Sequence, residues 1–290
     1  MFREAMLEGK TILITGGGTG LGRAMGTRFL ELGANLIITG RRKEILEQAA
    51  AEMCHEDKRI LALPCDVKDV HAVDDVIEAA LERFGQIDVL INNAAANFIS
   101  PTEKLTHNAF KLVADTVLMG SVHTTLSLGK HWIKQQQPAT VLNMLTTYAA
   151  TGSGFVVPSA CAKAGLEAMT KSLAFEWAKY KIRFVGIAPG PFPTDGAFDR
   201  IIPKADIGKE AEALDPKNHP WQRFGRHDEL ADLAAFLISD QAEYINGEIV
   251  RIDGGLTVAG SGEFNRLKDI TPQQWKLIRK QTRFSDSVRK

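Results

Sequence analysis

The stretch Thr15-Gly16-Gly17-Gly18-Thr19-Gly20-Leu21-Gly22 joins an apolar run, Thr11–Thr15, to a segment with apolar residues three and four apart, Leu21–Leu32. The run predicts a buried strand, and the spacing predicts a helix. Glycines at such a junction let the backbone approach a pyrophosphate, and the helix N-terminus adds N–H groups and a positive dipole end. The stretch therefore indicates a dinucleotide site rather than an ordinary tight turn. The expected contacts are Gly16, Thr19, Gly20, Leu21 and Gly22.

The same alternation of strand and helix continues along the chain. The further predicted strands are Leu36–Thr39, Ile60–Leu63, Val89–Asn92, Val141–Met144, Arg183–Ala188 and Ile249–Ile252. The further predicted helices are Lys43–Cys54, Asp69–Phe84, Thr106–Gln135, Val157–Tyr180 and Asp228–Ser239. Strands that are apolar on both faces are typical of a parallel sheet covered by helices on both sides. We predict a single-domain α/β fold with a Rossmann-like, doubly wound parallel sheet.

Two segments depart from this rhythm. Residues 190–226 form a long stretch rich in Pro, Gly and charge, and loops of this length inside a domain are usually lids or binding loops. We expect a substrate lid there. Residues 261–290 follow the domain of residues 1–260 and contain a short amphipathic helix, Pro272–Thr282. We expect this extension to pack on the domain or on a neighbouring subunit.

Composition excludes several classes of protein. The 290 residues are 44% hydrophobic, which supports a large buried core, and Lys+Arg and Asp+Glu are both 35. A net charge near zero argues against a nucleic-acid partner. No run approaches the ~20 apolar residues of a membrane span, so we expect no membrane partner. Three scattered cysteines suit a reducing compartment, and neither they nor the seven histidines show metal-ligand spacing. With no signal segment evident, we expect the cytoplasm, or the mitochondrion if a leader was removed.

The end of the second predicted strand bears on the choice of dinucleotide. It reads Thr39-Gly40-Arg41-Arg42 and has no carboxylate that would bind the ribose 2′-OH of NAD. Arginine at this place accommodates the 2′-phosphate of NADP. We therefore predict NADPH as cofactor with Arg41 as a contact, the alternative being two arginines that begin a solvated helix. Asp66, after the third strand, is placed to meet the adenine edge.

Further motifs match one superfamily over most of the chain. Asn92-Asn93-Ala94-Ala95, Lys163, Pro189-Gly190 and Asp253-Gly254-Gly255, together with the glycine stretch and Asp66, resemble the short-chain dehydrogenases/reductases. The resemblance implies that Lys163 binds the cofactor. The remaining cofactor contacts that we expect are Asn93, Pro189, Gly190, Pro191 and Phe192.

Two positions depart from that superfamily. Ser159 stands where a tyrosine is usual, four residues before Lys163, and Val117 stands where an asparagine is usual. A serine hydroxyl is too short and too weakly acidic to replace a phenol, so either the enzyme is inactive or the acid has moved. Tyr148 lies two residues after Thr146, and in an extended chain the two side chains project to the same side.

We therefore expect the phenol of Tyr148 to enter the substrate pocket from the strand side as one candidate donor. The second is Asn97, which follows the fourth predicted strand and which we expect to supply a donor from the opposite wall. Each candidate has an ordinary alternative: Tyr148 as a loop tyrosine and Asn97 as a turn former.

Three stretches resemble one subgroup, the mitochondrial-type 2,4-dienoyl-CoA reductases: residues 92–101, 151–159 and 261–265. The resemblance implies Tyr148 and Asn97 as catalytic donors to the substrate carbonyl, with Lys163 on the nicotinamide ribose and Ser159 as a supporting hydrogen bond. It implies Arg200 as a contact to the CoA part, and we expect Phe98 to contact the substrate as well. A homotetramer is also implied. Ala96 departs from the glycine expected there.

Two neutral donors suit a conjugated thioester, because hydride on the distal diene carbon puts negative charge on the thioester oxygen. We therefore expect NADPH-dependent reduction of 2,4-dienoyl-CoA to trans-3-enoyl-CoA, in β-oxidation of unsaturated fatty acids. One alternative is a 3-oxoacyl or other carbonyl reductase of the same superfamily. The other is a catalytically silent NADP(H)-binding regulator.

Overall fold

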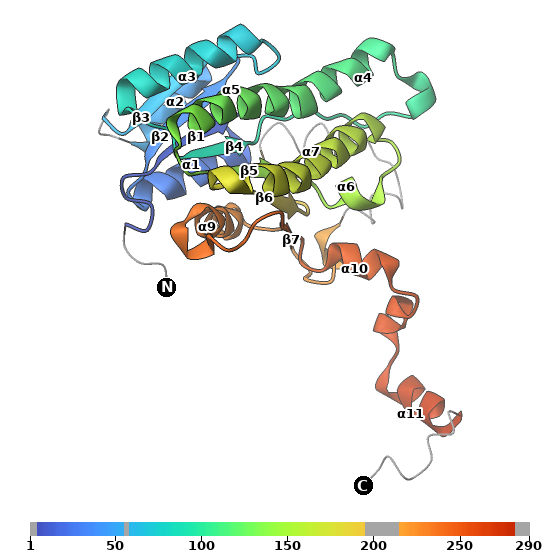
Figure 1. The fold of residues 1–290 in the computed structure, drawn as a ribbon. Helices are drawn as coiled ribbons and strands as arrows, with labels where there is room; N and C mark the ends of the chain where they lie inside the picture. Colours follow the sequence, from blue (N-terminus) through green and yellow to red (C-terminus); the bar gives the residue numbers. More distant parts are fainter. Residues whose placement is uncertain (1–4, 55–57, 195–214, 282–290) are drawn as a thin grey trace.

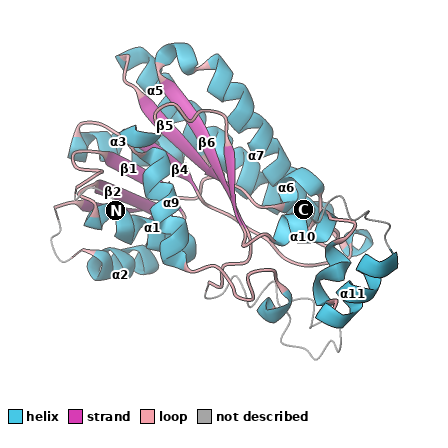
Figure 2. Cartoon of the chain, turned by 90° about the horizontal axis from the view of Figure 1, so that it is seen from below, coloured by secondary structure: helices cyan, strands magenta, loops and turns pink. Residues whose placement is uncertain are grey.

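The computed structural model describes residues 5–54, 58–194 and 215–281. Its centre is one parallel sheet of seven strands in the order β3-β2-β1-β4-β5-β6-β7. The strands are β1 (Thr11–Thr15), β2 (Asn35–Gly40), β3 (Ile60–Pro64), β4 (Val89–Asn92), β5 (Ala139–Met144), β6 (Ile182–Pro189) and β7 (Ile249–Ile252). Figure 2 shows the strands flanked by helices. The predicted single-domain, doubly wound α/β fold is confirmed.

Helices cover both faces of this sheet (Figure 1). Because strand side chains alternate between faces, Ile12 and Ile14 pack into one apolar layer and Leu13 into the other. The first layer includes side chains of α1 (Gly20–Glu31), α2 (Lys43–Met53) and α9 (His227–Ile238). The second includes side chains of α3 (Val70–Phe84), α5 (Gly120–Gln135) and α7 (Val157–Glu176).

The strand order has one switch point that positions a site. The chain runs outward from β1 to β2 and β3, and then returns to the other side of β1 with β4. Ligands of open parallel sheets bind outside the carboxyl ends of the strands at such a point. The polar segments that follow Thr15, Gly40, Asn92 and Met144 therefore meet at one edge of the sheet.

Two segments differ from the sequence prediction. The predicted helix Thr106–Gln135 is α4 (His107–Ala114), a π-helical turn at Asp115–Met119, and α5. After β5 the chain forms a short helix, α6 (Tyr148–Thr151), and the amide of Gly152 donates to the carbonyl of Tyr148 at 2.9 Å. The extended backbone that we predicted for Tyr148 is therefore wrong.

The C-terminal segment leaves the body of the molecule (Figure 1). It contains α10 (Leu256–Ser261), a 3₁₀ turn at Asn265–Asp269 and α11 (Pro272–Gln281), which agrees with the predicted amphipathic helix. Phe264 is 71% exposed and Leu277 59%. In the described part of the chain, α11 does not lie against its own domain, so packing on a neighbouring subunit stays a prediction. None of the helices of residues 5–54, 58–194 and 215–281 is long and apolar enough to span a bilayer.

Candidate active site

The glycine loop between β1 and α1 forms a close-packed cradle. Gly16 has a positive φ of +67°, and a Cβ on Gly22 would collide with the carbonyl oxygen of Gly16. The side-chain amide of Asn93 donates to the carbonyls of Thr15 and Gly16, both at 3.0 Å. Asn93 was predicted to contact the cofactor. That contact stays a prediction, and the side chain of Asn93 holds the glycine loop in place.

An open cleft with about 710 Å³ of free space runs along this loop. It is lined by the glycine loop and by the ends of β2, β3 and β4, at Gly16, Gly18, Thr19, Thr39, Gly40, Arg41, Arg42, Ile45, Leu46, Cys65, Asp66, Val67, Ala94, Ala95 and Thr116. Arg41 and Asp66 lie where the sequence predicts them, and Arg42 joins them. Asp66 is the only carboxylate of this lining and forms an ion pair with Lys68 at 3.3 Å. The cleft therefore presents net positive charge at the end of β2.

The loop after β6 packs against the segments that follow β7 and precede α9, and the cofactor contacts expected of it stay predictions. None of the expected contacts Pro189, Gly190, Pro191 and Phe192 lines this cleft. A Cβ on Gly190 would lie 2.8 Å from Cα of Asp253, and Phe192 is buried against Gly225. The residue that approaches the glycine loop is Thr194, whose side chain would lie 3.2 Å from a Cβ on Gly20.

Three polar side chains converge after the carboxyl ends of β4 and β5. The Oη of Tyr148, on α6, lies 3.2 Å from Nδ2 of Asn97 and 3.2 Å from Oγ of Ser159. The Oδ1 of Asn97 accepts a hydrogen bond from the amide of Phe98 at 2.9 Å, so its NH2 group faces Tyr148. The structure thus brings together Asn97, Tyr148 and Ser159 from three separate elements.

Lys163 lies on α7 four residues after Ser159 and is 7% exposed. Its Nζ donates to the main-chain carbonyl of Met144, at the end of β5. No carboxylate in the described part of the chain forms an ion pair with it. Burial lowers the pKa of Lys163 from 10.5 to about 8, because an ammonium loses its hydration there.

An apolar cluster fills the space behind the donors. Val117, in the π-helical turn, packs with Val113 and Ala162, and Ala96 and Phe98 pack against them. This cluster accommodates Val117, which departs from the superfamily pattern, because an asparagine there would need polar partners in apolar surroundings. It also accommodates Ala96, which departs from the glycine of the subgroup and contributes a methyl group to the cluster. Phe98, predicted to contact substrate, is partly buried in the same cluster.

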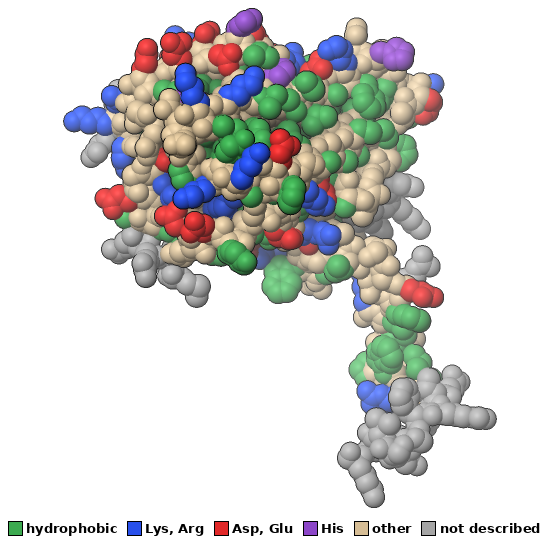
Figure 3. Space-filling model, in the orientation of Figure 1, with side chains coloured by type: hydrophobic (Ala, Val, Ile, Leu, Met, Phe, Trp, Pro, Cys, Tyr) green, Lys and Arg blue, Asp and Glu red, His purple; other side chains and the backbone are tan. Residues whose placement is uncertain are grey.

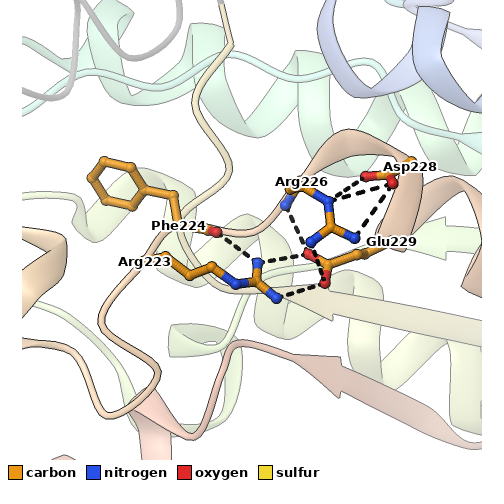
Figure 4. A network of polar contacts seen from close by, with 5 residues as sticks. All are labelled: Arg223, Phe224, Arg226, Asp228 and Glu229. Carbon is orange, nitrogen blue, oxygen red and sulfur yellow. Dashed lines mark hydrogen bonds and ion pairs between the residues drawn. The ribbon is translucent and has the colours of Figure 1, made fainter.

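Arginine–carboxylate pairs fix the end of the predicted lid, and sequence reasoning missed them (Figure 4). Arg223 binds Glu229 with two hydrogen bonds of 2.7 and 2.8 Å, and the amide of Arg226 donates to Glu229 at 2.9 Å. The hydrogen bonds from Arg223 and Arg226 lower the pKa of Glu229 to about 2. The described end of the lid is therefore held at the start of α9. Arg200 lies outside the described residues.

The sequence also gave no expectation for buried polar side chains at the ends of β4 and β5. Asn92 and Asn143 bind one another at 2.8 Å in the interior. The sequence feature that could have indicated this contact is an asparagine near the end of each of two otherwise apolar strands. No group of three or more potential metal ligands occurs among the residues that the structure describes.

A family model described as Enoyl-(Acyl carrier protein) reductase matches residues 16–257. The probable 2,4-dienoyl-CoA reductase 3 [(3E)-enoyl-CoA-producing] of Caenorhabditis elegans is 44% identical over 257 residues, which cover 88% of this chain and 82% of that protein. The probable 2,4-dienoyl-CoA reductase [(2E)-enoyl-CoA-producing] of Bacillus subtilis (strain 168) is 42% identical, covering 86% of this chain and 97% of that protein.

A solved structure shows the same fold. It is a 3-ketoacyl-(acyl-carrier-protein) reductase from Brucella melitensis complexed with NADH, with a TM-score of 0.78 and 31% identity, and the match covers 87% of this chain and 99% of that one. The resemblance to 2,4-dienoyl-CoA reductases that the sequence predicts is confirmed by these relatives. With the family model matching most of its length, this chain belongs to the short-chain dehydrogenase/reductase superfamily.

Proposed function

We propose that the protein reduces 2,4-dienoyl-CoA to trans-3-enoyl-CoA with NADPH. The observation that carries the proposal is the position of the Tyr148 hydroxyl, 3.2 Å from both Asn97 and Ser159. Position 159 has no phenol, and α6 supplies one whose hydroxyl lies within hydrogen-bond distance of the Ser159 side chain. The names of the C. elegans and B. subtilis relatives support the same substrate class.

The cleft residues fit a dinucleotide. A side chain on Gly22 would collide with the carbonyl oxygen of Gly16, and Gly16 has a positive φ, so both positions favour glycine as the tight, closely packed turn of a dinucleotide loop does. Arg41 and Arg42 place two cations where a ribose 2′-phosphate would lie, which supports NADPH over NADH. When bound, the cofactor supplies the hydride.

Tyr148 and Asn97 would act as neutral hydrogen-bond donors to the thioester oxygen. Asn97 donates one N–H to Tyr148 and keeps the other for the substrate, and its orientation is fixed by the amide of Phe98. The hydroxyl of Tyr148 can donate to the substrate while it accepts from Asn97. Donors aimed at developing negative charge are worth about 3 kcal/mol each. They stabilise the dienolate that forms when hydride reaches the distal carbon, and water then protonates the α carbon.

Lys163 would hold the nicotinamide ribose. Its ammonium is already fixed by the Met144 carbonyl, and two of its three N–H groups remain for ribose hydroxyls. Ser159 would keep the phenol in place through its hydrogen bond to Tyr148. We place Phe98 at the substrate, and we place Arg200 at the CoA part of the substrate because the family resemblance implies that contact.

The assembly is proposed to be a homotetramer. Figure 3 shows hydrophobic side chains gathered over α4, α5 and α7, and Leu112, Met119 and Leu126 are each at least 40% exposed. Large exposed apolar patches mark interaction surfaces. The role in β-oxidation and the cytoplasmic location stay predictions from the sequence.

The test is a steady-state assay with NADPH and 2,4-hexadienoyl-CoA that follows both chromophores. The proposal expects consumption of both at equal rates and a trans-3-enoyl product by NMR, whereas the 2E product would match the B. subtilis name. A 3-oxoacyl thioester serves as comparison, and turnover of it alone would identify a carbonyl reductase. NADPH binding without turnover of any acyl-CoA would identify a silent regulator.

A further inference from the structure

A chain of buried polar side chains crosses the carboxyl end of the sheet. The hydroxyl of Thr124 donates to Oδ1 of Asn92 at 2.7 Å, and Nδ2 of Asn92 donates to Oδ1 of Asn143 at 2.8 Å. The Nδ2 of Asn143 donates to Oγ1 of Thr170 at 2.8 Å, and Thr170 donates to the carbonyl of Leu166 at 2.8 Å. All four polar residues are at most 3% exposed. This series of hydrogen bonds links α5, β4, β5 and α7.

Two hydrogen bonds attach α7 to β5. Thr170 binds the side chain of Asn143, and Lys163 binds the carbonyl of the next residue, Met144. Residues seven apart lie on the same face of a helix, so both attachments point at the strand. Between them the helix buries apolar side chains such as Leu166.

Apolar contacts are not directional, so they resist sliding of a helix along a strand less than hydrogen bonds do. The axial position of α7 matters because this helix also carries Ser159, which binds Tyr148. A small displacement along β5 would move Ser159 and Lys163 together.

We propose that Asn143 and Thr170 are positioning residues that set the place of Lys163. They act by fixing α7 against β5, and neither touches the reacting atoms. The inference rests on the proposed function for its catalytic consequence, because there Lys163 holds the ribose. The structural part of the proposal, that Asn143 and Thr170 fix the position of Lys163, does not depend on the substrate.

The test compares two equally buried threonines. Thr170→Val removes the hydroxyl that holds α7, whereas Thr125→Val removes an equally buried hydroxyl on α5 that accepts from Asn92 at 3.0 Å. Thr170→Ser keeps the hydroxyl and serves as the rescue. The first measurement is competitive acetylation of the folded protein with acetic anhydride, in which mass spectrometry gives the reactivity of Lys163. It needs neither cofactor nor substrate.

We expect Thr170→Val to raise the reactivity of Lys163 about tenfold over wild type, the size that corresponds to one lost hydrogen bond. Thr125→Val and Thr170→Ser should stay near wild type. In steady-state assays Thr170→Val should raise the KM for NADPH and lower kcat, while Thr125→Val changes neither. Equal Lys163 reactivity in the two valine variants would overturn the inference.

A second variant covers the case in which Thr170→Val does not fold. Asn143→Leu combined with Thr170→Val replaces both partners of this contact by apolar groups. Asn92 loses the acceptor Asn143 but keeps its hydrogen bonds to Thr124 and Thr125. The double variant should fold and still show raised Lys163 reactivity, and wild-type reactivity would contradict the proposal. If wild type does not turn over dienoyl-CoA, the proposed function fails but the acetylation contrast still decides this inference.

Discussion

The arrangement of Tyr148, Asn97 and Ser159 makes a prediction about which hydroxyl does the chemistry. In the usual layout of the superfamily, the side chain four residues before the lysine is the acid. Here that side chain is Ser159, and the phenol comes from α6. We expect Tyr148→Phe to reduce kcat with 2,4-dienoyl-CoA far more than Ser159→Ala does.

The magnitudes follow from the contacts of each hydroxyl. Tyr148→Phe removes one donor to the thioester oxygen and also the acceptor of the Asn97 N–H. Loss of one oxyanion donor lowers kcat by about 10²–10³-fold. Ser159→Ala removes one neutral hydrogen bond of 3.2 Å to Tyr148, which is worth about 0.5–1.5 kcal/mol, or roughly three- to tenfold. The two variants should differ by at least about tenfold.

The assay measures kcat and KM for both substrates, together with the Kd for NADPH by fluorescence. Both variants should bind NADPH like wild type, because neither hydroxyl lines the dinucleotide cleft. A larger loss of kcat in Ser159→Ala than in Tyr148→Phe would refute the relocated donor. A large change of NADPH affinity in Tyr148→Phe would show that the phenol serves the cofactor instead.

Three further outcomes are expected. Arg41→Ala should raise the KM for NADPH about tenfold or more and leave that for NADH unchanged, since an arginine–phosphate contact is lost; equal effects on both cofactors would contradict the 2′-phosphate role. For Lys163, the folded-state pKa of about 8 lies below the unfolded value of 10.5, so the unfolded state binds more protons between these values and stability rises with pH. In urea unfolding, the free energy of unfolding of wild type should rise by up to about 3 kcal/mol from pH 8 to 10.5, at about 1.36 kcal/mol per pH unit. Lys163→Met should lack this rise, and equal pH dependence in the two proteins would contradict the prediction. Removing residues 262–290 should give a smaller assembly by light scattering with an unchanged melting temperature, because α11 stands away from its own domain; an unchanged mass would show that the tail is not at the subunit contact.

The strands were predictable because they are buried on both faces and bounded by turn residues. Thr11–Thr15, Val89–Asn92 and Ile249–Ile252 have the predicted bounds. The proximity of Asn97 and Tyr148 was predictable too, since both follow strands that are neighbours in the parallel sheet. In such folds the order of the elements decides which loops meet.

The backbone of short connecting segments was not predictable from pattern. The local sequence after β5 is compatible with either an extended or a helical backbone. In the structure α6 forms there, and its last hydrogen bond runs from the amide of Gly152 to the carbonyl of Tyr148. The π-helical turn at Asp115–Met119 likewise interrupts a continuous apolar spacing. A polar residue at this strand end predicts that Asn93 contacts the cofactor, and that prediction stands untested. Only the fold shows that its amide bonds the glycine loop.

The positions 148 and 159 are physically coupled. The hydroxyl of Tyr148 lies 3.2 Å from the Ser159 Oγ, so a larger side chain at position 159 would meet the phenol. A tyrosine at 159 would have to displace the α6 side chain, whereas a serine is short enough to leave that side chain in place and polar enough to bind the hydroxyl. Lys163 keeps its anchor on β5 in either case, because Met144 holds it independently of the phenol. The serine that departs from the superfamily pattern is therefore what allows a phenol to enter from α6.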